Sequence, residues 1–72
     1  MSTKSVLLSM FEADIEIATG NDKEDLQAVR NWISRAEDIS DKAKFMAHMR
    51  SIQTLAEKDA YIRATEWKRR QR

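Results

Sequence analysis

Apolar residues recur along most of the chain at the three- and four-residue spacing of α-helices, and they indicate three helical segments. The first segment is expected to begin at Ser2 or Thr3, either of which can cap a helix, and to stop at Gly20. Its apolar residues cover an arc of about 200° at 100° per residue. So wide an arc predicts contact with two neighbouring helices, or with one helix and a second subunit.

The second segment begins with a capping signal. Asn21 is followed three residues later by Glu24, an arrangement that resembles a capping box, and further acidic residues in this first turn suit the helix dipole. Trp32 lies just outside the narrow apolar stripe that follows. The stripe consists of Leu26, Val29, Ile33 and Ala36.

The third segment has Ser40 as its expected N-cap and no residue that forces a stop before the end of the chain. An unbroken helix over 41–72 would be about 45 Å long, against about 25 Å for each of the first two. Such a helix would overhang a monomeric bundle unless it bends near 57–59. Because the connections are short, neighbouring helices should be antiparallel. The sequence therefore predicts one all-α domain over 1–72, a helical hairpin followed by a long C-terminal helix.

Chain length favours self-association. A chain of 72 residues has a thin margin between apolar burial and conformational entropy, and it lacks disulfides. The apolar arcs also offer more surface than a three-helix core can enclose. We therefore expect a homodimeric bundle whose interface includes the third segment, with a compact monomer as the alternative.

Composition narrows the chemistry. No run of 10 consecutive apolar residues occurs, so no membrane span is expected. The absence of cysteine excludes thiolate metal sites and cysteine nucleophiles, and a single glycine cannot form a glycine-rich phosphate loop. The N-terminus does not resemble a secretory signal, which makes a cytoplasmic location the expectation. Neither a metal nor a cofactor is predicted, and an enzyme is not expected.

Charge is distributed unevenly between the two halves. Residues 1–40 hold four basic and eight acidic groups, a balance of −4, whereas 41–72 hold nine basic and four acidic groups, a balance of +5. These sum to the formal net charge of +1. An acidic body with a basic end can pair with itself or with a charged partner.

Two polar residues stand out among the apolar positions. Asp14 lies near the centre of the first apolar arc, and an unpaired buried carboxylate costs several kcal/mol. One interpretation is a charged contact at an interface, with a basic residue of the third segment as a candidate partner. The other is that the buried arc is narrower and that Asp14 lies at its exposed border. His48, the single histidine, is either a half-exposed packing residue or a pH-sensitive interface group.

Residues 63–72 form a basic helix end. Its cations are Arg63, Lys68, Arg69, Arg70 and Arg72, and aromatic residues are interleaved with them. This pattern suits nucleic-acid phosphate with base stacking, an acidic protein or membrane surface, or a solvated helix end that offsets the dipole.

The leading hypothesis is a small non-enzymatic interaction protein, an adaptor, inhibitor or regulator that covers the surface of a protein partner. Trp32, Tyr61 and Trp67 are the candidate anchors, together with the basic residues of 63–72, because aromatic and arginine residues dominate interface energetics. The alternative is a nucleic-acid-binding accessory protein that uses the basic C-terminal helix.

Overall fold

Four α-helices form the fold in the computed structural model, which describes residues 2–71. They are α1 (Thr3–Ile17), α2 (Gly20–Arg35), α3 (Lys42–Ser51) and α4 (Leu55–Arg70). The all-α prediction is confirmed. The prediction of three helices is wrong, because the expected long third helix consists of two.

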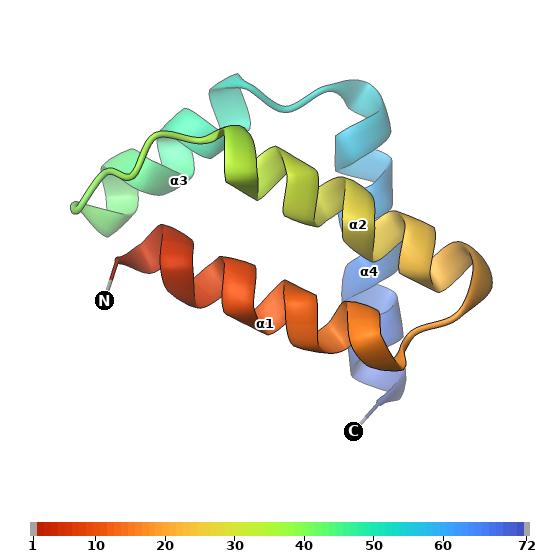
Figure 1. Ribbon diagram of the computed structural model, residues 1–72. Helices are drawn as coiled ribbons and strands as arrows, with labels where there is room; N and C mark the ends of the chain where they lie inside the picture. Colours follow the sequence, from red (N-terminus) through yellow and green to blue (C-terminus); the bar gives the residue numbers. More distant parts are fainter. Residues whose placement is uncertain (1, 72) are drawn as a thin grey trace.

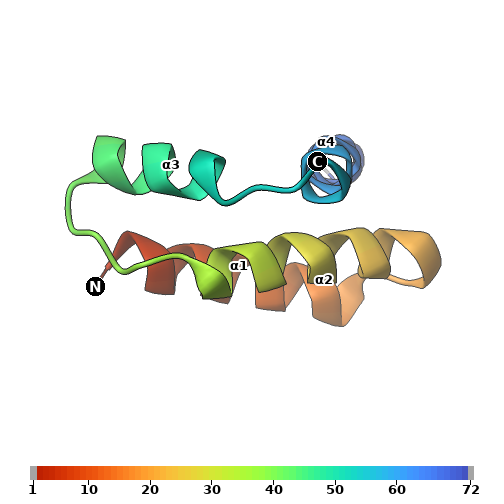
Figure 2. The ribbon, with the colours of Figure 1, turned by 90° about the horizontal axis from the view of Figure 1, so that it is seen from above.

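The helices lie in two layers. α1 and α2 lie side by side and form one layer, while α3 and α4 form the other (Figure 2). α4 crosses α1 and α2, whereas α3 lies over the opposite end of the hairpin (Figure 1). α3 and α4 thus diverge from their short connection and lie apart. No helix within residues 2–71 is both long and apolar enough to cross a membrane.

The break between α3 and α4 has a local cause. The Thr54 hydroxyl accepts a hydrogen bond from the Glu57 N–H at 3.1 Å, and the Glu57 carboxylate accepts one from the Thr54 N–H at 2.9 Å. This capping box starts a new helix at Leu55. The chain therefore turns at 52–54 and not near 57–59, and the expected overhang does not form.

The other helix ends differ from the prediction by a few residues. Ser2 caps α1 as expected, through a hydrogen bond from the Ser5 N–H. α1 ends at Ile17, however, and Thr19 is the N-cap of α2, so the expected capping box at Asn21 does not form. Gly20 adopts φ 58°, a left-handed conformation that glycine accepts without strain. At α3 the cap is Asp41, one residue after the predicted Ser40.

The core lies between the two layers and is centred on α2. Its four largest fully buried side chains come from α2 and α3 and are Phe45, Leu26, Ile33 and Val29. α4 contributes small residues, Ala60 and Ala64, which let it approach the hairpin closely. The core thus joins all four helices through different kinds of contact.

Candidate partner-binding groove

A groove of about 530 Å³ opens where α3 and α4 diverge. The hairpin forms its floor, and α3, the connection at Gln53 and α4 form its walls. Its lining is mainly apolar, and the residues are Leu7, Met10, Phe11, Val29, Trp32, Ile33, Met46, Met49, Arg50, Gln53, Lys58, Tyr61, Ile62, Thr65 and Lys68.

The floor and the rim of this groove differ in accessibility. Val29, Ile33, Phe11 and Trp32 are buried, so they close the bottom of the groove. Near its mouth, Met10 is 49% exposed, Tyr61 44% and Ile62 49%. A bound molecule would therefore meet an apolar rim first.

Trp32 holds the two walls in place from the floor. Its indole Nε1–H donates a hydrogen bond to the carbonyl of Met49 on α3 at 2.8 Å. Its ring also meets the ring of Tyr61 on α4 edge to face, with centroids 5.9 Å apart and planes at 78°. Trp32 is itself buried, so its role in the groove is structural support, whereas Tyr61 faces outward. Trp67 is only 5% exposed and belongs to the core.

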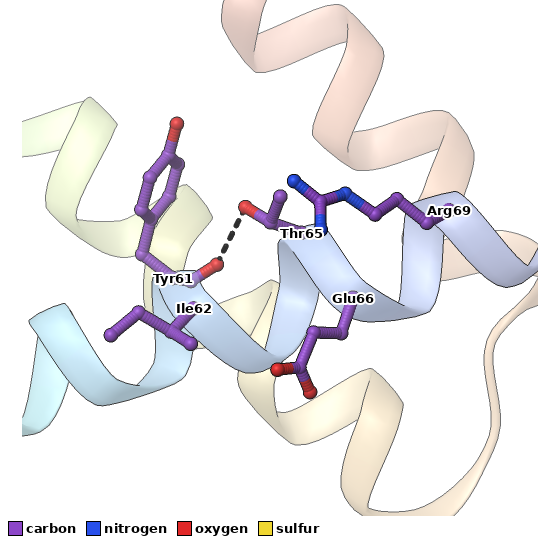
Figure 3. A pocket seen from close by; sticks show the side chains of 5 residues that line it. All are labelled: Tyr61, Ile62, Thr65, Glu66 and Arg69. Atoms are coloured by element: carbon purple, nitrogen blue, oxygen red, sulfur yellow. Dashed lines mark hydrogen bonds between the residues drawn. The ribbon is translucent and has the colours of Figure 1, made fainter.

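A second depression, of about 230 Å³, lies along α4 beside the groove, with which it shares Tyr61, Ile62 and Thr65 (Figure 3). Its five lining side chains all come from this helix and include Tyr61 and Arg69. The Thr65 hydroxyl donates a hydrogen bond to the Tyr61 carbonyl at 2.9 Å (Figure 3). Because a single helix provides no opposing wall, this depression cannot enclose a ligand, and the groove is the better candidate site.

The basic C-terminal residues are largely paired within the chain. Arg63 donates two hydrogen bonds to the carboxylate of Asp25, at 2.9 and 3.0 Å, and this interaction raises the pKa of Arg63. Arg70 lies 3.6 Å from Asp22. These pairs reduce the positive charge available for phosphate. Arg69 is exposed, and Arg72 lies outside the described residues.

Asp14 contacts a basic residue of α4. Lys68 Nζ lies 3.1 Å from Asp14 Oδ2, without the alignment of a hydrogen bond, so the interaction is that of an ion pair. The same ammonium lies 4.4 Å from the centre of the Phe11 ring, where a cation–π interaction is favourable. Asp14 and Phe11 together hold Lys68 at the α1 end of the groove.

His48 lies on α3 and is half-buried. Its Nε2 atom has no hydrogen-bond partner, and His48 does not line the groove. Within residues 2–71, no three histidine or carboxylate side chains are placed to hold a metal ion. His48 therefore adds no recognised chemistry to the site.

Glu57 fixes the wall that α4 contributes. A hydrogen bond from Arg35 is the main cause that lowers its pKa to about 2, opposed by burial and assisted by the bonds from Thr54. The Arg35–Glu57 ion pair, at 2.7 Å, connects the end of α2 to the start of α4. This interaction fixes the point at which α4 departs from α3.

Several groove residues were not singled out by the sequence. They are Met10, Met46, Met49, Arg50 and Lys58. Periodicity treats methionines as ordinary core positions, and an isolated cation on a helix has no distinguishing pattern. Comparisons with protein families, curated proteins and solved structures found no significant match.

Proposed function

We propose that the protein is a small non-enzymatic interaction protein, an adaptor, inhibitor or regulator, that binds a helix of a protein partner in the groove. The observation that carries this proposal is that all three methionines within residues 2–71 line the groove beside exposed Tyr61 and Ile62. Methionine is flexible and polarizable, and it is common on surfaces that adapt to apolar partners.

The size of the groove supports a helix as the bound element. A volume of about 530 Å³ lies within the range of about 300–1,000 Å³ that is usual for binding pockets. A whole helix is too large to be enclosed, but the apolar side chains along one helical face can enter while the backbone stays outside. Helix-in-groove recognition uses such anchors at i, i+3, i+4 and i+7.

The charged groups of the lining support binding over catalysis. The ionisable lining residues are Arg50, Lys58, Lys68 and Tyr61. None of these four side chains is a carboxylate or an imidazole, and three of them are cations, so the lining suits the attraction of negative charge better than acid–base catalysis. The nucleic-acid alternative receives less support, because Arg63 and Arg70 of the basic helix end are already paired with carboxylates.

Capture from a lysate of the native host, with matched variants on α4, tests the proposed function. Ile62→Glu places a charge at the groove mouth, and Leu55→Glu changes an exposed apolar residue of the same helix outside the groove. A protein retained by the wild type and Leu55→Glu but lost with Ile62→Glu is the expected result. Equal retention by Ile62→Glu would contradict binding in the groove.

We also propose that the chain forms a homodimer, through α1 in place of the third segment that the sequence predicted. Val6, Ala13 and Ile17 are all exposed, lie outside the groove lining and follow one another at spacings of seven and four residues. That spacing places them on one narrow stripe suited to helix pairing. Light scattering at micromolar concentration should give about twice 8.4 kDa. The mass of a single chain would contradict this proposal.

A further inference from the structure

Cations flank the apolar part of both groove walls. On α3, Lys42 lies one helical turn before Met46 and Arg50 one turn after it, so all three share a face. On α4, Lys58 lies near the start of the wall and Lys68 near its end. Of these four cations, Arg50, Lys58 and Lys68 line the groove, and Lys42 lies outside its lining.

The groove lining carries positive charge without carboxylates. None of the lining residues is acidic. Glu57, which lies close to Lys58 in sequence, directs its carboxylate to Arg35 and Thr54. Of the described residues, no carboxylate lies within 4 Å of the charged groups of Arg50 and Lys58. The end of the groove nearest the α3–α4 connection is therefore positive.

Several cations outside the groove are paired with carboxylates. Arg30 forms an ion pair with Glu12 at 3.1 Å, and Arg63 forms a bidentate pair with Asp25. The groove thus combines an apolar centre with uncompensated positive charge, from Arg50 and Lys58, at the end nearest the α3–α4 connection. Complementary charge across an interface favours the correct partner and speeds its association.

We infer that the groove binds an acidic amphipathic helix of a partner protein, one with an apolar stripe and glutamate or aspartate on both sides of it. This inference rests on the proposed function and adds the chemistry of the partner. The apolar stripe enters between Met46 and Tyr61, and the flanking carboxylates meet Arg50 on α3 and Lys58 on α4, at the end nearest the α3–α4 connection. Because these cations are exposed, they contribute more to selectivity than to total affinity.

Three synthetic helical peptides test the inference. They carry the same leucine stripe at i, i+3, i+7 and i+10, and their flanking residues are all glutamate, all glutamine or all lysine. Fluorescence anisotropy with the labelled peptides measures affinity, and ¹³C-methyl spectra of Met10, Met46 and Met49 report whether a peptide occupies the groove. We expect the glutamate peptide to bind about tenfold more tightly than the lysine peptide at low salt, and the difference to shrink as salt rises.

Charge reversal at the rim supplies the matched control. Arg50→Glu with Lys58→Glu should abolish or invert the preference for the glutamate peptide. Lys23→Glu with Lys44→Glu makes the same change in net charge on exposed residues outside the groove lining, and should preserve the preference. Circular dichroism of both double variants confirms that the four helices persist.

The outcomes separate the two proposals. Equal binding of all three peptides, with shifts of the groove methyl groups, would overturn the acidic preference and leave helix binding in place. Absence of methyl shifts with every peptide would overturn both. Displacement of the glutamate peptide by a 20-nucleotide single-stranded DNA at a similar concentration would also overturn the inference, because the rim would then be accepting polyanions in general.

Discussion

α3 and α4 both pack on the layer formed by α1 and α2, but they are attached in different ways. α4 approaches closely through Ala60 and Ala64, and ion pairs tie it to the hairpin. α3 is attached by Phe45 and Met49 and by the hydrogen bond from Trp32. The first attachment is tightly packed and rich in charge; the second depends on a few large side chains. The groove opens between these two attachments.

This difference gives the groove one firm wall and one adaptable wall. Small residues and charged hydrogen bonds fix the position of α4 within narrow limits. Methionine can change rotamer at little cost, so the α3 wall can adjust to the shape of a bound side chain. A binding groove built in this way can hold one orientation of a partner helix and still tolerate variation in its apolar residues.

The largest expected loss of stability follows from removing Phe45, the fully buried side chain that attaches α3 to the hairpin. Phe45 is fully buried, and Phe45→Ala should destabilise the protein by about 3–5 kcal/mol. A domain of this length has a total stability of about 4–11 kcal/mol, so the variant should lose a large part of it. Urea denaturation followed by circular dichroism measures the change. A loss below about 1 kcal/mol would show that α3 does not depend on this residue.

Overpacking tests the close approach of α4. Ala64 is buried, and Ala64→Leu should force α4 away from the hairpin at a cost of about 1–3 kcal/mol. Ala56→Leu makes the same substitution at an exposed position of α4 and should change stability by less than about 0.5 kcal/mol. Similar unfolding midpoints for the two variants would mean that the α4 contact is not tightly packed.

Much of this architecture follows from the sequence. The helical class, the cap at Ser2 and the α2 stripe of Leu26, Val29 and Ile33 were predictable, because each depends on residues close together in the chain. The break before α4 was also encoded, in Thr54 and Glu57. The apolar spacing continues across the break, from Ile52 to Ala56 and Ala60. Because this spacing is that of one continuous helix, it led to the prediction of a single helix despite the capping box.

The groove itself could not be predicted, because it depends on two helices failing to meet. Periodicity identifies which residues turn away from water, but it does not show whether Met46 and Tyr61 face each other across a closed contact or an open space. The pairing of Asp14 with Lys68 has the same limitation. The sequence raised a basic partner as one interpretation, and only the crossing of α4 over α1 brings the two residues together.

Acid should weaken the attachment of α4 more than that of α3. Hydrogen bonding from Arg35 lowers the pKa of Glu57 from its ordinary 4.5 to about 2, so the folded state holds this carboxylate charged where the unfolded state protonates it. The stabilisation that the Glu57 carboxylate gives to the folded state is therefore complete above pH 4.5 and is lost as the pH falls toward 2.

Glu57→Gln isolates this contribution, because glutamine can still accept the Thr54 N–H of the capping box. At pH 7 the variant should be less stable by about 1–2 kcal/mol, the size of a hydrogen bond to a charged group. The difference from the wild type should narrow between pH 4.5 and pH 2 in urea titrations. A constant difference over that range would exclude Glu57 as its source.

The smallest expected change in stability comes from the ion pair between Asp14 and Lys68, which joins α1 to α4 beside the groove. Asp14→Asn removes the charge that holds Lys68, and because both side chains are partly exposed, the cost in stability should be about 0.2–1 kcal/mol and should shrink with added salt. The same substitution leaves Lys68 uncompensated at the rim of the groove. The glutamate peptide should consequently bind Asp14→Asn more tightly than the wild type, although the variant is slightly less stable. Anisotropy titrations and thermal melts of the same samples measure both quantities. Weaker binding alongside lower stability would show that Asp14 serves to position Lys68 for the partner, and that the pair belongs to the binding site as a unit.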